Sequence, residues 1–336
     1  MPVAGLWLIS LGYRLGLFLR GLLCRGIVKA SCPVISVGNL TVGGTGKTPV
    51  VIMLAEFLAE RKKIVAIVSS GYGRTSAENI IAVGHAIRQR SVAEVGDEVM
   101  MMAERLPRVL FAVGKSKSEM ALKLRDRQPD VIIVDDGYQH RRLYRDVNIL
   151  LLDAERDLRS EALFPLGRLR EPIKAIARAD CVILNRKSAG YGRSVVQEWL
   201  EAAYPDLQVS EIRRLNENII SQQLIKPLTD IKEKRYYILA GIGDGAAFAE
   251  TLTARLGQPL RVRLFPDHCA YTDADLGKIR EDVEQVHPDY LLTTHKDYVK
   301  LRGFDFGAEM YYVDLTLKFE SGRVDFFELV RGKIER

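Results

Sequence analysis

The segment NLTVGGTGKTPVV, residues 39–51, limits the fold of this chain more than any other stretch. An apolar run at residues 33–38 precedes it, and apolar side chains at helical spacing follow from Lys47 to about Ala59, which predicts a buried strand, a glycine turn and a helix. In such a turn, backbone N–H groups converge on phosphate oxygens, the lysine reaches the β- and γ-phosphates, and the next hydroxyl holds Mg²⁺. The residues predicted to bind the nucleotide are Thr41, Val42, Gly43, Gly44, Thr45, Gly46, Lys47 and Thr48.

One position of this segment departs from the usual phosphate loop, G-x-x-x-x-G-K-S/T. Thr41 stands five residues before Gly46, where the pattern has glycine. The segment is therefore either a variant loop with a wider turn or a glycine turn that ends by chance in Gly-Lys-Thr. The strand expected before it and the helix expected after it favour the variant loop.

A second acidic motif, VIIVDDG at residues 131–137, supports nucleotide binding. Asp135 and Asp136 follow four apolar residues, as at the end of a buried strand. Paired aspartates at a strand end are commonly plain turn residues. Next to a Lys-Thr loop in a parallel-sheet pattern, however, they are typical of the carboxylates that hold the Mg²⁺ of a nucleotide.

Short apolar runs alternate with helical stretches from residue 33 to 153 and again from 179 to 294. This alternation predicts βαβ units, hence an α/β fold of the P-loop NTPase type with a mainly parallel sheet and helices on both faces. Residues 154–177 interrupt the rhythm with prolines and mixed charges. We predict a core at 29–155, a second smaller α/β lid domain at 160–315, and a C-terminal helix at about 317–336 that returns to the core.

The N-terminal segment is basic and apolar. No Asp or Glu occurs before Glu56, and residues 4–23 are apolar except where Arg14 and Arg20 interrupt them. The uncharged runs are too short to span a bilayer, so residues 1–28 are predicted to form an amphipathic helix on an anionic membrane surface. The alternative is a helix packed on its own domain. No nucleic-acid-binding motif is present, so nucleic acid is not an expected partner.

Several segments occur together, in order, between about residues 33 and 301: PVISVGNLTVGGTGKTPVV, SSGYGR, EVGDEVMMMA, VDDGYQHRRLYRDVNILLLD, LFPLGRLREP, FPDHCAYTDADL and TTHKDYVKL. As a set they resemble the tetraacyldisaccharide 4′-kinase family, which phosphorylates a lipid A precursor at the inner membrane of Gram-negative bacteria. The family takes a small hydroxyl residue at the position of Thr41, which supports the variant loop.

The resemblance implies transfer of the γ-phosphate of ATP to the 4′-hydroxyl of tetraacyldisaccharide 1-phosphate, giving lipid IVA, with ATP and Mg²⁺ as cofactors. It also implies a peripheral or monotopic enzyme on the cytoplasmic face of the inner membrane, whose partners are the acylated disaccharide phosphate lipid and an anionic membrane surface. No obligate protein partner is evident.

The resemblance also assigns roles at the site. Asp97 is implied to be the base, although the residues alone would favour a helix N-cap there. His268, from the second domain, would pair with Asp97 when that domain closes, orienting the base and raising its basicity. Lys47 and Arg170 would neutralise phosphate charge. The expected metal ligands are Thr48, Glu98, Asp135 and Asp136, and the expected substrate contacts are Asn39, Tyr72, Gln139, His140 and Arg141.

A membrane-associated P-loop ATPase switch is the alternative function. It would resemble the partitioning ATPases, which share a Gly-Gly-x-Gly-Lys-Thr loop but carry a signature lysine where this chain has Val42. A guanine-reading Asn-Lys-x-Asp motif is not supplied by NRKS at residues 185–188, so ATP is the expected nucleotide. The family usually has Arg where this chain has Ser70, so any anionic contact made there by Arg is absent or replaced.

Overall fold

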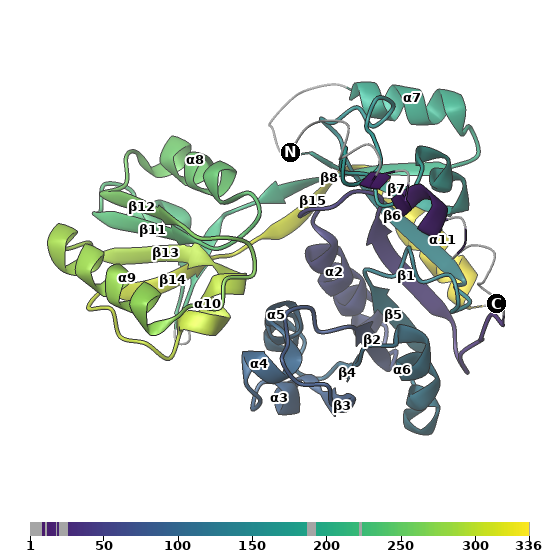
Figure 1. Cartoon of the computed structure of the whole chain (residues 1–336), viewed down its shortest axis with the longest axis horizontal. Helices are drawn as coiled ribbons and strands as arrows, with labels where there is room; N and C mark the ends of the chain where they lie inside the picture. Colours follow the sequence, from purple (N-terminus) through teal and green to yellow (C-terminus); the bar gives the residue numbers. More distant parts are fainter. Residues whose placement is uncertain are drawn as a thin grey trace.

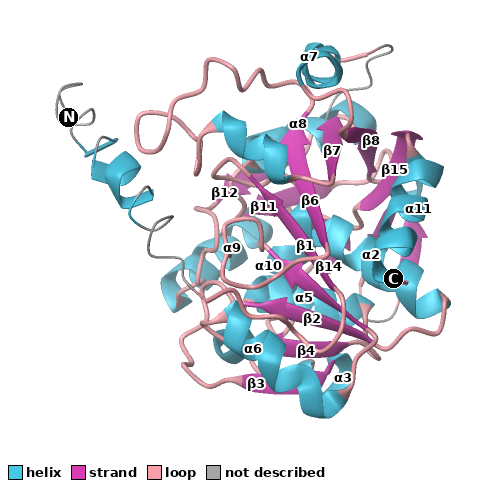
Figure 2. Cartoon of the chain, turned by 90° about the vertical axis from the view of Figure 1, so that its right-hand side faces the viewer, coloured by secondary structure: helices cyan, strands magenta, loops and turns pink. Residues whose placement is uncertain are grey.

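The computed structural model describes residues 9–10, 12–17, 19, 26–186, 193–221 and 224–335. The helix expected near the N-terminus falls partly on these residues: 9–10, 12–17 and 19 are helical. Residues 1–8, 11, 18 and 20–25 of that expected segment lie outside the described residues. The predicted helix does not reach residue 28, because residues 26–28 are not helical and Val28 forms a parallel bridge with Leu143. Figure 2 shows this N-terminal helix projecting beyond the larger part of the molecule.

Within the described residues, nine strands form one large sheet in the order β15-β8-β7-β6-β1-β5-β2-β4-β3. Neighbouring strands are parallel except at the two edges, where β3 and β15 run antiparallel to their neighbours. The central strands are buried on both faces, which explains their continuous apolar runs. The strands are β1 (Val34–Asn39), β2 (Val65–Ser69), β3 (Ile80–Val83), β4 (Leu110–Val113), β5 (Val131–Asp135), β6 (Val147–Asp153), β7 (Cys181–Arg186), β8 (Gln208–Leu215) and β15 (Thr316–Ser321).

Helices cover both faces of this sheet because successive strand residues point to opposite sides. Ile35 and Ile133 pack with α2 (Lys47–Glu60), α5 (Asp97–Arg105) and α11 (Arg323–Ile334) on one face. Val34 and Ile132 pack with α6 (Lys117–Lys123) on the other. The predicted fold class is confirmed. The other helical elements of this larger unit are α3 (Gly84–Ile87), α4 (Val92–Val95), η1 (Leu124–Arg127), η2 (Ile173–Arg178) and α7 (Val195–Ala203).

The C-terminal helix α11 packs on the large sheet, as expected from its amphipathic sequence. It begins at Arg323 and not near residue 317, because residues 316–321 form the edge strand β15. Phe326 and Val330 are fully buried in the same core as α2. The rings of Phe57 and Phe327 also stack, with their centroids 4.0 Å apart. The last helix therefore adds to the nucleotide-loop core although it lies far from it in sequence.

A second sheet of the described chain has the order β10-β9-β14-β13-β11-β12 and forms a smaller unit (Figure 1). Its elements are β9 (Asn218–Ile220), β10 (Ile225–Pro227), η3 (Leu228–Ile231), β11 (Tyr236–Ala240), α8 (Gly245–Leu256), β12 (Arg261–Leu264), α9 (Asp273–Val286), β13 (Tyr290–Thr294), α10 (His295–Leu301) and β14 (Glu309–Val313).

The domain boundary was expected near residue 160, but the chain leaves the large sheet only after β8, which ends at Leu215. Strands β7 and β8 lie in the large sheet, since β7 pairs in parallel with β6 from Ile149↔Cys181 onward. The proline-containing break at 154–177 interrupts the periodicity without ending the sheet. The chain passes from one sheet to the other through residues 216–217 and returns through residues 314–315 (Figure 1).

Helix α10 of the smaller unit lies against α5 of the larger one. Glu104, near the end of α5, lies 2.7 Å from His295 Nε2 through its Oε2 atom, and it forms an ion pair with Arg302. Arg105 pairs with Asp314 at 2.8 Å where the chain re-enters the large sheet. These contacts place the smaller unit beside the helix that begins at Asp97.

Candidate active site

The glycine loop lies between β1 and α2, as the sequence predicts. Gly43 and Gly46 have φ angles of 105° and 88°, a left-handed conformation that side chains disfavour. A Cβ atom on Gly46 would also lie 2.8 Å from Asn185 Nδ2 and 2.9 Å from Arg214 Nη2. The loop therefore requires glycine there, and it ends with Lys47 and Thr48 in the first turn of α2.

The structure explains why Thr41 need not be glycine. Thr41 is buried and forms an antiparallel bridge with Leu169. Val42 N donates to Arg168 O at 2.8 Å, and Arg170 N donates to Leu40 O at 2.6 Å. Residues 168–170 thus hold the start of the loop in an extended conformation. They lie within residues 154–177, which the sequence predicted to be only a connecting segment.

Asn39, the last residue of β1, holds the loop through a side-chain hydrogen bond. It is fully buried, and its Nδ2 donates to Thr45 Oγ1 at 2.9 Å. Asn185 Nδ2 donates to Thr45 O at 2.8 Å from β7. Asn39 has no exposed surface in this structure, so the expected contact of Asn39 with substrate stays a prediction.

Asp136 is the charged partner of the loop. It lies 3.4 Å from Lys47 Nζ and 2.9 Å from Arg170 Nη1. Burial alone would raise the pKa of Asp136, but Lys47, Arg170 and Lys117 hold it well below its usual range. Arg170 therefore reaches the site, although its guanidinium is engaged by Asp136. A role in neutralising phosphate stays a prediction.

Asp135 ends β5 in a buried position. Its Oδ2 accepts from Ser69 Oγ at 3.1 Å, while its Oδ1 has no hydrogen-bond partner among the described residues. Burial raises the pKa of Asp135, although Lys117 opposes the rise. Burial and Asp135 likewise raise the pKa of Glu98 to about 7, against Lys296 and Lys47. The nearby lysines therefore do not fully offset the burial of either carboxyl, and a bound metal ion would supply further positive charge.

These donors fit a partly hydrated Mg²⁺ rather than a closed metal cage. Among the described residues, no three His, Cys, Asp or Glu side chains are grouped so that they could hold a metal ion alone. Mg²⁺ usually keeps several waters and takes one or two carboxylates together with substrate phosphates. The unpartnered Asp135 oxygen and the buried hydroxyl of Thr48 suit that mode.

Lys117 is a site residue that the sequence reasoning missed. Its side chain is 3% exposed, and its Nζ donates to the backbone oxygens of Asp135 at 2.6 Å and Asp136 at 2.9 Å. Burial lowers the pKa of Lys117, against both aspartates. Its ammonium fixes the turn that carries the acidic pair. The only signal in the sequence was a lysine in the first turn of a helix.

Asp97 and His268 meet across the two units, as the family resemblance implied. Asp97 is 4% exposed, and its Oδ2 lies 3.1 Å from His268 Nδ1 and 3.0 Å from Lys300 Nζ. Its Oδ1 accepts from the backbone N of Glu98 at 2.8 Å. The ring of Tyr72 packs edge-on against His268, with centroids 4.5 Å apart. Tyr72 is thus at the site, whereas the N-cap of α5 is Gly96.

The expectation that His268 raises the basicity of Asp97 is wrong. Burial alone would raise the pKa of Asp97, but the hydrogen bond with His268 and the charges of Lys296 and Lys300 lower it to about 2. A hydrogen-bond donor stabilises the charged form of a carboxylate. His268 therefore orients Asp97 and keeps it ionised.

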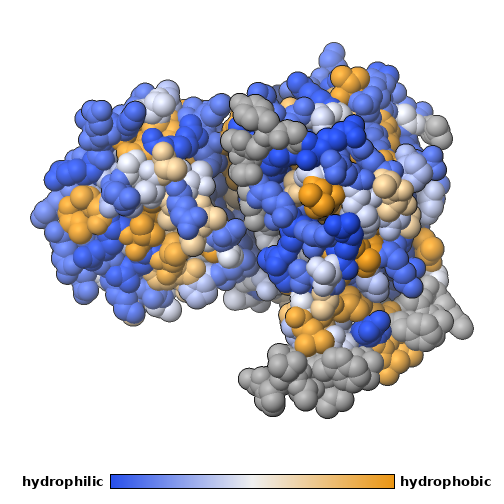
Figure 3. Space-filling model, turned by 90° about the horizontal axis from the view of Figure 1, so that it is seen from above, coloured by the Kyte–Doolittle hydropathy of each residue, from blue (hydrophilic) through white to orange (hydrophobic). Residues whose placement is uncertain are grey.

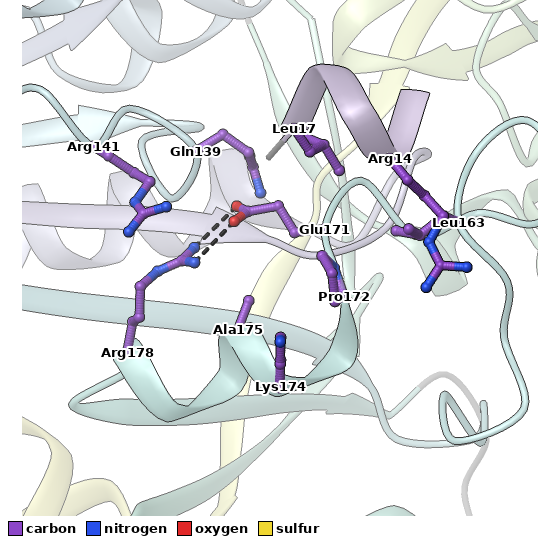
Figure 4. Close-up of a pocket in the computed structure, with 10 residues that line it drawn as sticks. All are labelled: Arg14, Leu17, Gln139, Arg141, Leu163, Glu171, Pro172, Lys174, Ala175 and Arg178. Carbon is purple, nitrogen blue, oxygen red and sulfur yellow. Dashed lines mark hydrogen bonds and ion pairs between the residues drawn. The ribbon is translucent and has the colours of Figure 1, made fainter. Parts of the chain in front are cut away.

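Cavities extend from this site toward the N-terminal helix. One of about 380 Å³ is lined by Asp136, Arg170 and His140 among others, and it shares Leu17 and Gln139 with a neighbouring cavity of about 450 Å³. The larger cavity, drawn in Figure 4, is lined by Arg14, Leu17, Gln139, Arg141, Leu163, Glu171, Pro172, Lys174, Ala175 and Arg178.

The larger cavity is basic. Arg178 is held by Glu171 through hydrogen bonds of 2.8 and 2.9 Å (Figure 4). Arg141 and Lys174 also line it, from the loop after β5 and from η2. The sequence predicted Gln139, His140 and Arg141 near the site, and the structure places all three along these cavities. Nothing in the sequence identified Lys174 as a residue of this cavity.

Comparisons with known proteins agree with the sequence resemblance. A family model described as tetraacyldisaccharide-1-P 4′-kinase matches residues 2–334. The tetraacyldisaccharide 4′-kinase of Geobacter metallireducens is 36% identical over 90% of this chain and 89% of that protein. The one from Aquifex aeolicus is 35% identical over 95% of this chain and 94% of that protein. A crystal structure of the "apo" form of LpxK from Aquifex aeolicus in complex with ATP aligns with a TM-score of 0.78 and 30% identity, over 99% of this chain and all of that one.

Proposed function

The chain belongs to the tetraacyldisaccharide-1-P 4′-kinase family, and from this we propose that it transfers the γ-phosphate of ATP to the 4′-hydroxyl of tetraacyldisaccharide 1-phosphate, giving lipid IVA. The observation that carries the proposal is the buried Asp97 carboxylate, which His268 of the other unit contacts at 3.1 Å. A nucleotide switch has no need of a base assembled from two units, whereas a kinase needs one to receive the hydroxyl proton.

In the proposed reaction the acceptor hydroxyl oxygen bonds to the γ-phosphorus of ATP. The bond from that phosphorus to the β–γ bridging oxygen breaks, and its electron pair leaves with ADP. Asp97 receives the hydroxyl proton. Lys47 would offset negative charge on the phosphates, and the backbone N–H groups of the glycine loop would donate hydrogen bonds to them.

The metal would be held by Thr48, Glu98, Asp135 and Asp136 together with phosphate oxygens, where it neutralises charge. In its absence Lys47 and Arg170 balance Asp136. A metal ion held by Asp136 would supply the positive charge that Arg170 supplies to this carboxylate in the structure. The Arg170 guanidinium would then be free to bind a phosphate of the nucleotide or of the lipid.

The polar head of the lipid is proposed to occupy the basic cavity of Figure 4. Arg141→Gln is therefore expected to raise the KM for the lipid about tenfold and to leave the KM for ATP unchanged, because a phosphate loses one charge-assisted hydrogen bond. Steady-state kinetics with each substrate varied in turn measure this. Arg125→Gln, at an exposed position on η1, is the matched control. An unchanged lipid KM in Arg141→Gln would place the phosphate elsewhere.

The N-terminal helix is proposed to hold the enzyme at the anionic cytoplasmic face of the inner membrane as a peripheral protein. Ile9, Leu15 and Leu19 are 51%, 58% and 46% exposed. Figure 3 shows hydrophobic residues gathered where this helix projects. None of the helices among the described residues is long and apolar enough to cross a bilayer.

Leu15→Glu is expected to lower partitioning onto vesicles of anionic phospholipid about tenfold, because one leucine side chain leaves the lipid interface and a negative charge enters it. Sedimentation with vesicles measures the bound fraction. Leu122→Glu on α6, an exposed leucine of similar accessibility at 44%, is the control. Equal binding of the two variants would show that the helix does not hold the membrane.

The proposed activity is tested by following label from the γ-phosphate of ATP into tetraacyldisaccharide 1-phosphate in mixed micelles. Labelled lipid supports the kinase. Hydrolysis of ATP without labelled lipid would favour the membrane-associated ATPase switch instead.

A further inference from the structure

Two lysines of α10 lie beside the Asp97–His268 pair. Lys296 and Lys300 are four residues apart and therefore share one face of the helix. Their side chains are 13% and 11% exposed. Lysines so poorly solvated are uncommon unless they are paired, and both are paired with groups of the site.

Lys296 bonds to the far nitrogen of the His268 ring. Its Nζ lies 2.9 Å from His268 Nε2 and 2.8 Å from Asp267 Oδ1. An ammonium group has three donors and no acceptor, so Nε2 can only be the acceptor in this contact. The carboxylate oxygen of Asp267 is 3.9 Å from Nε2, too far to accept a proton from it.

The tautomer of His268 follows from this contact. When Nε2 accepts, the proton of the neutral ring is on Nδ1, and Nδ1 donates to Asp97 Oδ2 at 3.1 Å. The backbone of His268 is also held, since its N donates to Asp267 Oδ1 and its φ is 57°. A ring fixed at both nitrogens has no lone pair left for a substrate hydroxyl.

We propose that Lys296 is a positioning residue that fixes His268 as the neutral Nδ1–H tautomer, so that Asp97 rather than the imidazole receives the hydroxyl proton. Lys300 acts in parallel on the carboxylate itself, forming an ion pair with Asp97 Oδ2 at 3.0 Å. Both lysines come from the smaller unit. The base is therefore oriented only when α10 is seated on α5, a position that Glu104 secures through His295 and Arg302.

The expected effect on kcat rests on the proposed kinase activity, whereas the tautomer of His268 follows from its contacts alone. Lys296→Met is expected to lower kcat for lipid phosphorylation about 10- to 100-fold, because the carboxylate and imidazole lose their fixed orientation. The KM for ATP is expected to stay within about twofold. Lys296→Arg keeps a donor at this position and is expected to recover most of the rate. Lys278→Met, at an exposed position on α9, should behave as wild type.

A spectroscopic measurement separates positioning from a merely structural role. With ¹⁵N-labelled histidine, long-range ¹H–¹⁵N correlation spectra report which ring nitrogen carries the proton. His268→Gln identifies the signal among the five histidines of the chain. The expected result at about pH 7.5 is a proton on Nδ1 in the wild type and loss of that preference in Lys296→Met.

Each outcome decides something. A wild-type ring protonated on Nε2 or on both nitrogens would overturn the inference, as would a Lys296→Met kcat within about twofold of wild type. If the wild type shows the Nδ1–H tautomer but never phosphorylates the lipid, the proposed function fails while the tautomer assignment stands. If the lipid is phosphorylated and Lys296→Met has no effect, the proposed function stands and the positioning role of Lys296 fails.

Discussion

Asp97→Asn is expected to lower kcat for lipid phosphorylation about 1,000-fold, which is within the range that a positioned base contributes. The amide keeps the size of the carboxylate but cannot take the hydroxyl proton. It also loses the charge that attracts Lys300, at 3.0 Å, and the acceptor strength that holds His268. Affinity for ATP is expected to stay within about twofold, because the phosphate loop is formed by other residues.

The pH dependence of the wild type follows from the same site. Burial would raise the pKa of Asp97, yet His268, Lys296 and Lys300 hold it at about 2. The carboxylate therefore stays ionised from about pH 5 to 8, and protonation of Asp97 is not expected to lower the rate in that range. Rates measured across this range with saturating ATP and lipid provide the check.

Asp273→Asn is the matched control for Asp97, because Asp273 is also the first residue of a helix and is exposed on α9. It should retain the wild-type rate. Should Asp97→Asn also retain more than about a tenth of the rate, Asp97 would be a structural residue at the start of α5 and not the base.

Lys47→Met is expected to lower kcat about 1,000-fold and to raise the KM for ATP, since the loop lysine stabilises charge that builds up on the transferring phosphoryl group. The fold is expected to survive. Asp136, which lies 3.4 Å from Lys47, keeps its hydrogen bonds to Arg170 and the nearby charge of Lys117.

Steady-state kinetics and thermal unfolding together measure the effect of Lys47→Met. Lys318→Met, an exposed lysine on β15, controls for loss of a surface charge. A Lys47→Met enzyme with near wild-type kcat would mean that the phosphate charge is offset by other cations, such as Arg170.

Features that are contiguous in sequence were predictable. The phosphate loop is one strand, one turn and one helix, so the glycines, Lys47 and Thr48 identify it without tertiary information. Asp135 and Asp136 follow a short apolar run typical of a buried strand, which the structure shows as β5. The meeting of Asp97 and His268, 171 residues apart, came from the family resemblance and could not be read from spacing.

Features that depend on packing between distant segments were missed. Lysines are usually solvated, so nothing in the sequence marks Lys117 as buried or Lys296 as poorly exposed beside carboxylates. Residues 168–170 pair with the start of the loop through backbone hydrogen bonds. This pairing was not predicted, because the prolines in the same segment indicated an irregular connection. The assignment of β7 and β8 to the large sheet was missed because a long irregular connection resembles a domain boundary.

The most direct test of the proposed function compares wild type with Asp97→Asn in mixed micelles of tetraacyldisaccharide 1-phosphate, using Mg²⁺ and ATP labelled at the γ-phosphate. The predicted result is rapid labelling of the lipid by the wild type and loss of about 1,000-fold in that rate in the variant, with ATP still bound. Hydrolysis of ATP by the wild type without any label in the lipid would contradict it.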